Sequence, residues 1–414
     1  MKDDFRQTRL PGMLFAWLLF FPAVVCSENP SPDPQQSLSP MLRIEWRRGP
    51  NLPQGFQDSD GGILGGRLIT VGGFCSGGLN ADNQHKPGVY PRGFLNKGWA
   101  LNLKHPADGW ASIDPFPGVP RQGLSAVQVG DALLFWGGFS YSDPFCYRDG
   151  WRLTRRQGVW KWDPLPAMPW PLSSPAMAVI GSRIYLFGGA DYDATQFYTD
   201  VDRHGKTERM GARLLVIDAS RLEDGWKELP ACPGSPRWVH TMAAVGGRLY
   251  VLGGATGNTV QDGTSYGYCT VVDNWSFDPV REQWTRLRDL AVSSGNFPRS
   301  PGNVFRGRYI LLPGGHQYGY VRNPDGTIRE KYGTASSANP ASGLYNNVFV
   351  YDTRTDLFGT AGILPIDNNL PMTVVRGNQI YLVGGETGGG VVLGEYYGHH
   401  PDLFLQGTIR TLPR

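Results

Sequence analysis

A short hydrophobic segment that ends in two glycines recurs along this chain and constrains its fold more than any other feature. It occurs six times, as RLITVGG, ALLFWGG, RIYLFGG, RLYVLGG, YILLPGG and QIYLVGG, with the second glycine at Gly73, Gly138, Gly189, Gly254, Gly315 and Gly385. Each segment has the length of a β-strand and is closed by residues that can take positive φ. The sequence therefore predicts a repeat protein in which every repeat contributes this strand.

An aromatic residue recurs in phase with the glycine doublets and precedes turns rich in leucine and proline. The six instances are Trp46, Trp110, Trp162, Trp226, Trp284 and Phe358. Between doublet and aromatic lies a further strand, such as ARLLVID at 212–218, and another strand precedes each doublet, as in HTMAAVGG at 240–247. Four strands per repeat, a charged fraction of only 18 % and no long helical stretch predict an all-β fold, in which the doublets and aromatics serve packing.

The succession of glycine doublet, strand and tryptophan resembles the kelch family of β-propellers over residues 41–414. The resemblance implies a six-bladed kelch-type propeller. Trp46 precedes every doublet, and no aromatic unit follows the last strand at 402–409. We therefore expect the strand around residues 44–47 to join the last blade, which would close the ring and remove the exposed sheet edges.

The first 26 residues have the layout of a signal peptide. Lys2, Arg6 and Arg9 precede an apolar run from Met13 to Val25, and small residues lie near Cys26. The run is shorter than the roughly 20 residues of a membrane span, so we expect cleavage after Cys26 and export to the periplasm or the extracellular space, with an uncleaved anchor as the alternative. A linker rich in proline and serine follows at 27–40, before the propeller at 41–414.

Charge and chain length limit the partners. The net charge is +3 and no run of lysine and arginine occurs, which excludes nucleic acid as the expected partner. Without its signal the chain is expected to have no membrane span and to be a monomer. Charge and length alone do not choose between a small-molecule sugar, a polysaccharide and a protein as the partner.

The repeats differ in length mainly after their doublets, so we expect one face to carry the function. Successive doublets lie 51 to 70 residues apart, whereas a kelch unit has about 50. The extra residues are at 74–97, 190–211, 255–269, 316–345 and 386–401. In a four-stranded blade these loops leave on one face, which predicts a pocket walled by loops there. Loops that only shield a hydrophobic rim are the alternative.

Four cysteines remain after removal of the signal. They lie in loops of this face, and an oxidising compartment favours their pairing as Cys75 with Cys146 and Cys232 with Cys269. Buried thiols are the alternative. The spacing of the seven histidines predicts no zinc site, and the aspartates of 190–205 lack the spacing of a calcium-binding EF-hand loop, so no metal and no cofactor are expected. Calcium binding by these aspartates is the alternative.

Candidate ligand-binding and catalytic residues gather at the starts and ends of the inner strands. Arg121, Arg237 and Arg299 each follow a proline before an inner strand, where a guanidinium suits a carboxylate or paired hydroxyls. The alternative is that they pair with neighbouring blades. His316 and Glu386 directly follow doublets and are suited to move a proton near neutral pH. Tyr318 and Trp238 are expected to pack against a sugar.

Two segments, FPGVPRQGLSAVQVGDALLFWGG at 116–138 and GGETGGG at 384–390, resemble exported bacterial N-acetylneuraminate epimerases, which interconvert sialic acid anomers. That family has a glutamate after its fourth doublet and an arginine six residues later. Here the fourth unit reads GGATGNTVQ, and His316 and Arg322 have this spacing in the fifth unit. The resemblance implies an exported propeller that binds an acidic sugar and acts as a mutarotase or related isomerase. A non-catalytic module that binds a protein or a polysaccharide is the alternative.

Overall fold

The structure, a computed structural model, describes residues 38–77, 92–142, 144–191, 211–257, 260–261, 264–265, 268–290, 299, 302–316, 320–323, 325–330 and 343–412. All of them belong to one compact unit, Ser31–Arg414. Apart from the short 3₁₀-helices η2 (Pro106–Asp108) and η3 (Leu222–Asp224), the regular structure of the described residues is strand, which confirms the all-β prediction. The described residues contain no helix long and apolar enough to cross a membrane.

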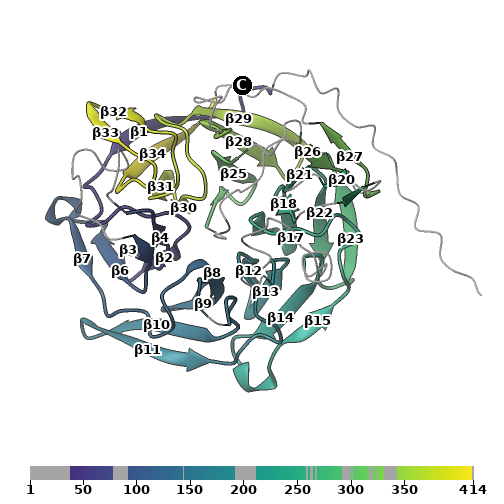
Figure 1. Cartoon of the computed structure of the whole chain (residues 1–414), viewed down its shortest axis with the longest axis horizontal. Coiled ribbons are helices and arrows are strands. Elements are labelled where there is room, and N and C mark those ends of the chain that lie inside the picture. Colours follow the sequence, from purple (N-terminus) through teal and green to yellow (C-terminus); the bar gives the residue numbers. More distant parts are fainter. Residues whose placement is uncertain are drawn as a thin grey trace, which may run out of the picture. The chain divides into compact units, whose positions relative to one another are not determined.

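The described strands of the repeats form four-stranded antiparallel sheets, which follow one another around a common centre in Figure 1. In chain order the sheets are β2 (Asp60–Leu64), β3 (Arg67–Val71), β6 (Gly98–Asn102) and β7 (Trp110–Ser112); β8 (Gln122–Val129), β9 (Ala132–Phe139), β10 (Gly150–Arg156) and β11 (Val159–Leu165); β12 (Ala176–Ile180), β13 (Arg183–Phe187), β14 (Leu214–Asp218) and β15 (Lys227–Leu229); β16 (Thr241–Val245), β17 (Arg248–Leu252), β22 (Asn274–Asp278) and β23 (Gln283–Leu287); β24 (Val304–Phe305), β25 (Tyr309–Pro313), β28 (Asn347–Asp352) and β29 (Leu357–Ile363); and β30 (Met372–Arg376), β31 (Gln379–Val383), β34 (Phe404–Thr411) and β1 (Leu42–Arg48).

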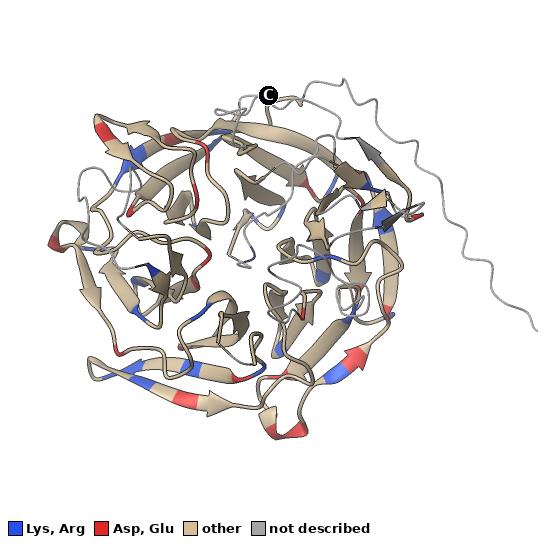
Figure 2. Cartoon of the chain, in the orientation of Figure 1, with Lys and Arg blue, Asp and Glu red and all other residues tan. Residues whose placement is uncertain are grey.

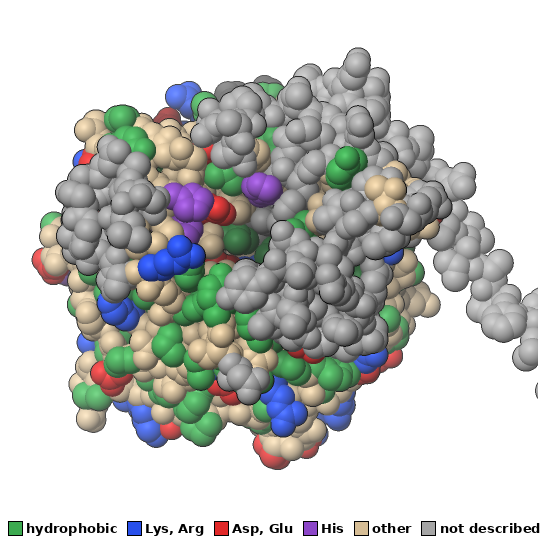
Figure 3. Space-filling model, in the orientation of Figure 1, with side chains coloured by type: hydrophobic (Ala, Val, Ile, Leu, Met, Phe, Trp, Pro, Cys, Tyr) green, Lys and Arg blue, Asp and Glu red, His purple; other side chains and the backbone are tan. Residues whose placement is uncertain are grey.

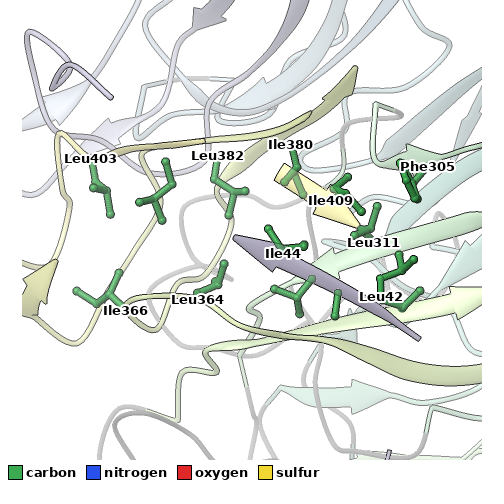
Figure 4. Packing of buried hydrophobic residues seen from close by; sticks show 14 of the residues in the cluster. Leu42, Ile44, Phe305, Leu311, Leu364, Ile366, Ile380, Leu382, Leu403 and Ile409 are labelled. Atoms are coloured by element: carbon green, nitrogen blue, oxygen red, sulfur yellow. The ribbon is translucent and has the colours of Figure 1, made fainter. Parts of the chain in front are cut away.

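The last of these sheets combines the two ends of the described chain. Strand β1 pairs antiparallel with β34 along its whole length, from Leu42 opposite Thr411 to Arg48 opposite Leu405. Figure 4 shows Leu42 and Ile44 of β1 directed into a cluster with Ile380, Leu382 and Ile409 of their own sheet and Leu311 of the neighbouring sheet. The hydrophobic core therefore lies between adjacent sheets, and the first described strand is part of it.

The glycine doublets connect each sheet to the next. The N–H of Gly73 donates to the carbonyl oxygen of Arg121 at 2.9 Å, and a Cβ on Gly72 would lie 2.9 Å from that same oxygen. Gly72 and Gly73 have φ of +74° and +107°, a region that favours glycine. The same link joins Gly189 to Arg237 and Gly315 to Asn368. The doublets recur because the neighbouring backbone comes too close for a side chain.

The repeated tryptophans form a second set of links along the outer strands. The indole N–H of Trp162 donates to the carbonyl of Asp114, which follows the outer strand of the preceding sheet, at 3.0 Å. Trp110 donates in the same way to Pro50 and Trp284 to Pro230. Both repeated features therefore serve packing, as the sequence predicts.

Charged residues of opposite sign are interspersed on the outer strands, as Figure 2 shows. On β10 and β11, for example, Asp163 lies 2.8 Å from Lys161 and 3.5 Å from Arg152. Exposed pairs of this kind contribute little to stability and define no binding surface.

Candidate functional site

The segments that follow the doublets carry additional strands, and two of them pair with each other. Strands β18 (Ala255–Thr256) and β21 (Cys269–Val271) follow the fourth doublet, and β26 (Tyr320–Arg322) and β27 (Ile328–Glu330) follow the fifth. They form one sheet in which β21 and β26 are parallel. Among the described residues, three short hairpins accompany the doublets. They are β4 (Phe74–Cys75) with β5 (Gly93–Phe94) after the first doublet, β19 (Val260–Gln261) with β20 (Thr264–Ser265) between β18 and β21, and β32 (Gly390–Val392) with β33 (Glu395–Tyr397) after the sixth doublet.

Two of the three candidate arginines are buried inside their own sheets. Arg237 is fully buried, and its guanidinium lies 2.6 Å from the carboxylate of Asp273 and 3.1 Å from the carbonyl of Gly253. Arg121 is 1 % exposed and lies 2.6 Å from Asp149. These guanidiniums have no surface to offer a ligand, so we assign both arginines to structural roles. Their partners come from the same sheet, whereas the alternative to ligand binding that the sequence left open was pairing with a neighbouring blade.

The third arginine spans the centre of the described unit. Arg299, which precedes β24, contacts the carboxylate of Asp58, which precedes β2, and donates to the carbonyl of Leu124 on β8 at 3.0 Å. Both charged side chains are buried. Burial raises the pKa of Asp58 despite the opposing charge of Arg299, and the charge of Glu386 raises it further. The ion pair of Arg299 and Asp58 is therefore buried and lies close enough to Glu386 for their charges to interact.

Glu386 belongs to a cluster with two histidines that lie next to each other in the sequence. One ligand atom from each of Glu386, His399 and His400 lies within 4.8 Å of the other two. Glu386 Oε1 is 3.3 Å from His399 Nε2, and Glu386 Oε2 accepts from the amide of Asn369 at 2.9 Å. His399 Nδ1 is 3.2 Å from the carbonyl oxygen of Thr387. Each side chain of the Glu386–His399 pair is thus oriented by a contact on the side away from its partner. Both side chains remain partly exposed.

His400 is more buried than His399 and is kept neutral. Its Nδ1 accepts from the backbone N–H of Ser76 at 2.8 Å, its ring meets Phe74 edge-on, and it stacks on His399 with ring centres 4.3 Å apart. Burial lowers the pKa of His400 to about 3, and the charges of His399 and Arg92 act in the same direction. The cluster therefore joins one neutral ring to a carboxylate and imidazole that can exchange a proton.

Aromatic and basic side chains lie beside this cluster. The guanidinium carbon of Arg92 is 5.8 Å from the ring centre of Phe74, and Arg92 is exposed. Tyr141 is 43 % exposed and packs edge-on against Phe94 at 4.7 Å. Figure 3 shows histidines gathered with acidic and basic side chains on one hollowed face. A cation and aromatic rings next to a carboxylate and imidazole are suited to a polar, ring-shaped anion.

The remaining predicted site residues lie on other elements or outside the described part of the chain. His316 directly follows its doublet and pairs through its backbone with Leu344, and Trp238 pairs in the same way with Ala255. Arg322 is half-buried on β26. Tyr318 and residues 192–205 of the aspartate-rich segment lie outside the described residues.

The predicted disulfides are not formed. The four cysteines are buried thiols, and no disulfide joins any cysteines of the described residues. Cys232 packs with Trp275 in the core between two sheets, and its sulfur accepts from the N–H of Gly234. Cys146 packs with Phe139 and Phe145 in a separate cluster, with its sulfur 3.8 Å from the carbonyl of Ala190. Cys232 and Cys146 are thus buried in two different hydrophobic clusters.

A cavity of about 530 Å³ lies at the opposite ends of the inner strands. It is lined mainly by glycine and valine, among them Gly61, Val179 and Val374, and Arg376 is its charged residue. Strands β2 and β30 run from the long-loop face toward this end, so the cavity lies on the other side of the Asp58–Arg299 pair. Its backbone-rich lining offers little for proton transfer.

The KLHDC2/KLHL20/DRC7 Kelch-repeats domain matches residues 123–385, so the chain belongs to the kelch-repeat family. Among curated proteins, the N-acetylneuraminate epimerase of Pasteurella multocida (strain Pm70) is 22 % identical over 368 residues, which are 82 % of this chain and 89 % of that protein. The N-acetylneuraminate epimerase of Haemophilus influenzae (strain 86-028NP) is 24 % identical over 370 residues, or 83 % and 89 %. Both resemblances predicted from the sequence are confirmed.

Among solved structures, one described as "Structure of YjhT" superposes with a TM-score of 0.57 at 13 % identity, covering 84 % of this chain and 95 % of that one. This likeness shows the kelch-type fold alone.

Proposed function

We propose that this chain is a six-bladed kelch propeller that binds an acidic sugar on its long-loop face and interconverts the sugar's anomers. The closed ring is supported by contacts of the inner strands in cyclic order, from β2 through β8, β12, β16, β24 and β30 back to β2. The pairing of β1 with β34 joins the two ends of the described chain within the last sheet, and a hydrogen bond from the N–H of Gly385 to the carbonyl of Phe56 links this sheet to the first one.

The pair of Glu386 and His399 is the observation that carries the proposed activity. Because His399 Nδ1 faces the carbonyl oxygen of Thr387, this nitrogen bears a proton. Nε2 is then the nitrogen that faces the carboxylate, 3.3 Å away, and an N–H there can donate to Oε1. A carboxylate and an N–H side by side can accept and donate protons in one event.

Mutarotation needs this combination. The carboxylate of Glu386 takes the proton of the anomeric hydroxyl while the N–H of His399 gives its proton to the ring oxygen. The bond between anomeric carbon and ring oxygen breaks, which leaves a ketone and a ring-derived hydroxyl. After rotation about the neighbouring carbon–carbon bond, the reverse transfers close the ring with the other anomeric configuration. Atoms and protons balance, and no cofactor is consumed.

The specificity for an acidic sugar is assigned to Arg92. Its exposed guanidinium lies near His400 and over Phe74, where it can pair with the sugar's carboxylate, and Tyr141 offers an exposed ring. Trp238 and His316, which lie next to doublets, are proposed to line the same face. The names of the curated relatives support N-acetylneuraminate as the first ligand to test.

The substrate assignment is tested by binding. Replacing Arg92 by Gln should weaken N-acetylneuraminate binding, measured by calorimetry, by about 10- to 100-fold, because a hydrogen bond between charged groups is lost. N-acetylmannosamine, which lacks the carboxylate, should be unaffected by the change. Arg156→Gln, at an exposed position on the outer part of β10, is the matched control. Equal binding of the acid by all three proteins would exclude Arg92 as its partner.

Export is a separate part of the proposal. The signal at 1–26 is expected to be removed, so that protein recovered from the periplasm of a bacterial host begins at Ser27. Intact mass measurement distinguishes this product from a chain that retains Met1 and stays with the cells' membranes or cytoplasm, which would contradict export.

A further inference from the structure

We propose that Glu386, His399 and His400 form a binding site for one divalent transition-metal ion of the zinc class. Two imidazoles and a carboxylate are ligands that such ions accept. The glutamate follows the doublet at the end of β31, and the two histidines follow β33. The cluster therefore exists only in the folded chain.

The separation of the first two ligand atoms suits a tetrahedral ion. Glu386 Oε1 and His399 Nε2 are 3.3 Å apart. Zinc binds oxygen and nitrogen at roughly 2.0 to 2.2 Å, and two such ligands at a tetrahedral angle lie about 3.3 to 3.5 Å from each other. An ion can therefore lie between Oε1 and Nε2 without a large movement of either side chain.

Both of these ligands also have the supporting hydrogen bonds that metal ligands require. His399 directs Nδ1 at the carbonyl of Thr387, which fixes the tautomer that leaves the Nε2 lone pair for an ion. Asn369 donates to Oε2 of Glu386, which leaves Oε1 for the ion. This arrangement orients each ligand from the side opposite to the metal.

His400 is the third ligand and is expected to bind the ion less strongly than Glu386 and His399. Its Nδ1 accepts from the N–H of Ser76. The neutral ring must give up this bond when it coordinates, because the ion either takes Nδ1 itself or takes Nε2 and leaves the ring proton on Nδ1. The positive charge of Arg92 nearby opposes a bare cation. Access is not an obstacle, because the side chains of His399 and Glu386 are 45 % and 26 % exposed. Three protein ligands leave a fourth position to water or to the anionic ligand of Arg92, as in catalytic rather than structural sites.

One consequence rests on the proposed function. If Glu386 and His399 transfer the proton in mutarotation, a bound ion takes its place and stops the transfer. Metal binding itself does not depend on that function, since it is measured without sugar.

The test is titration of the full, untagged chain, freed of metal with a chelator, with ZnCl₂ in a calorimeter and with Co²⁺ followed by its visible absorption. We expect one ion per chain and a cobalt spectrum of low coordination number without thiolate bands. Glu386→Gln and His399→Gln should each lose most of the affinity, and Asn369→Ala should weaken it about tenfold, as expected for a residue that orients a ligand. His105→Ala, at an exposed position before η2, is the matched histidine control and should bind as the parent does.

Two results would overturn the site. One is the absence of saturable binding to the parent chain, and the other is equal affinity of the parent, Glu386→Gln and His399→Gln. Circular dichroism of each variant separates a lost ligand from a lost fold. A parent chain that binds the ion but does not speed anomer exchange when metal-free would support the metal site and contradict the proposed function.

Discussion

Arg237 and Asp273 form an ion pair in which neither side chain reaches solvent, with Nη2 and Oδ2 2.6 Å apart. The indole of Trp275 donates to the same carboxylate oxygen at 2.7 Å. Arg121 and Asp149 repeat the arrangement two sheets earlier, with Trp151 as the indole donor. The Arg237 charge lowers the pKa of Asp273, although burial acts in the opposite direction. Both guanidiniums are thus buried against a carboxylate of their own sheet, as expected for a structural role.

Replacing Arg237 by Ala should therefore lower the free energy of unfolding by about 3 to 5 kcal/mol, because it leaves the buried carboxylate of Asp273 without a counter-ion. Urea unfolding followed by tryptophan fluorescence measures this change. An unchanged free energy of unfolding together with a loss of sugar affinity would restore the ligand-binding role expected from the sequence.

His240 should make the stability depend on pH. It is fully buried, neither ring nitrogen has a hydrogen-bond partner among the described residues, and burial lowers its pKa well below the ordinary value. Below pH 6.5 the unfolded chain takes up a proton that the folded chain does not, so the stability present above pH 6.5 is lost as the pH falls. In His240→Gln the slope of unfolding free energy against pH should be smaller by about 1.4 kcal/mol per pH unit in this range. Parallel slopes for both proteins would contradict the prediction.

The proposed closure of the ring predicts that β1 is important for stability. Ile44 is 8 % exposed and packs into the core between the last two sheets (Figure 4). Ile44→Ala should cost about 2 to 5 kcal/mol in thermal or urea unfolding. The same truncation at Val280, which is 91 % exposed, is the control and should change little. Equal stability of the two variants would mean that β1 is not part of the closed ring in solution.

The cysteines should behave as thiols. Burial raises the pKa of Cys232 to about 12, so iodoacetamide at pH 8 should leave it unmodified in the folded chain. In denaturant without a reductant, peptide mapping should find all four thiols alkylated. Recovery of disulfide-linked peptides containing Cys75 with Cys146, or Cys232 with Cys269, would contradict the structure.

The fold could be predicted because the glycine doublets and the tryptophans that link neighbouring sheets repeat along the chain. Gly73, Gly189 and Gly315 mark the same backbone approach, so six copies in phase define the repeat even though a single doublet would mean little. The structural role of Arg237 was also readable, since Asp273 precedes Trp275 by two residues just as Asp149 precedes Trp151.

The site could be predicted only in part, because its residues meet through loops that have no repeat. Glu386 was named from its place after a doublet, whereas His399 and His400 showed no metal-ligand spacing and are brought to Glu386 by the return of the chain after β33. Arg92 and Asp58 lack a local pattern altogether. These contacts depend on the conformations of the loops, and loops have no repeating sequence pattern from which their conformations can be predicted.

The central claim is that Glu386 and His399 interconvert sugar anomers. The most direct measurement is proton NMR of freshly dissolved N-acetylneuraminate, following the approach to anomeric equilibrium with the metal-free full chain, with Glu386→Gln, and with His105→Ala as the control. We predict that the parent and His105→Ala accelerate the exchange and that Glu386→Gln loses at least about 100-fold of this acceleration, within the range of acid–base catalysis. Line broadening of the sugar without acceleration by the parent, or full acceleration by Glu386→Gln, would contradict the account.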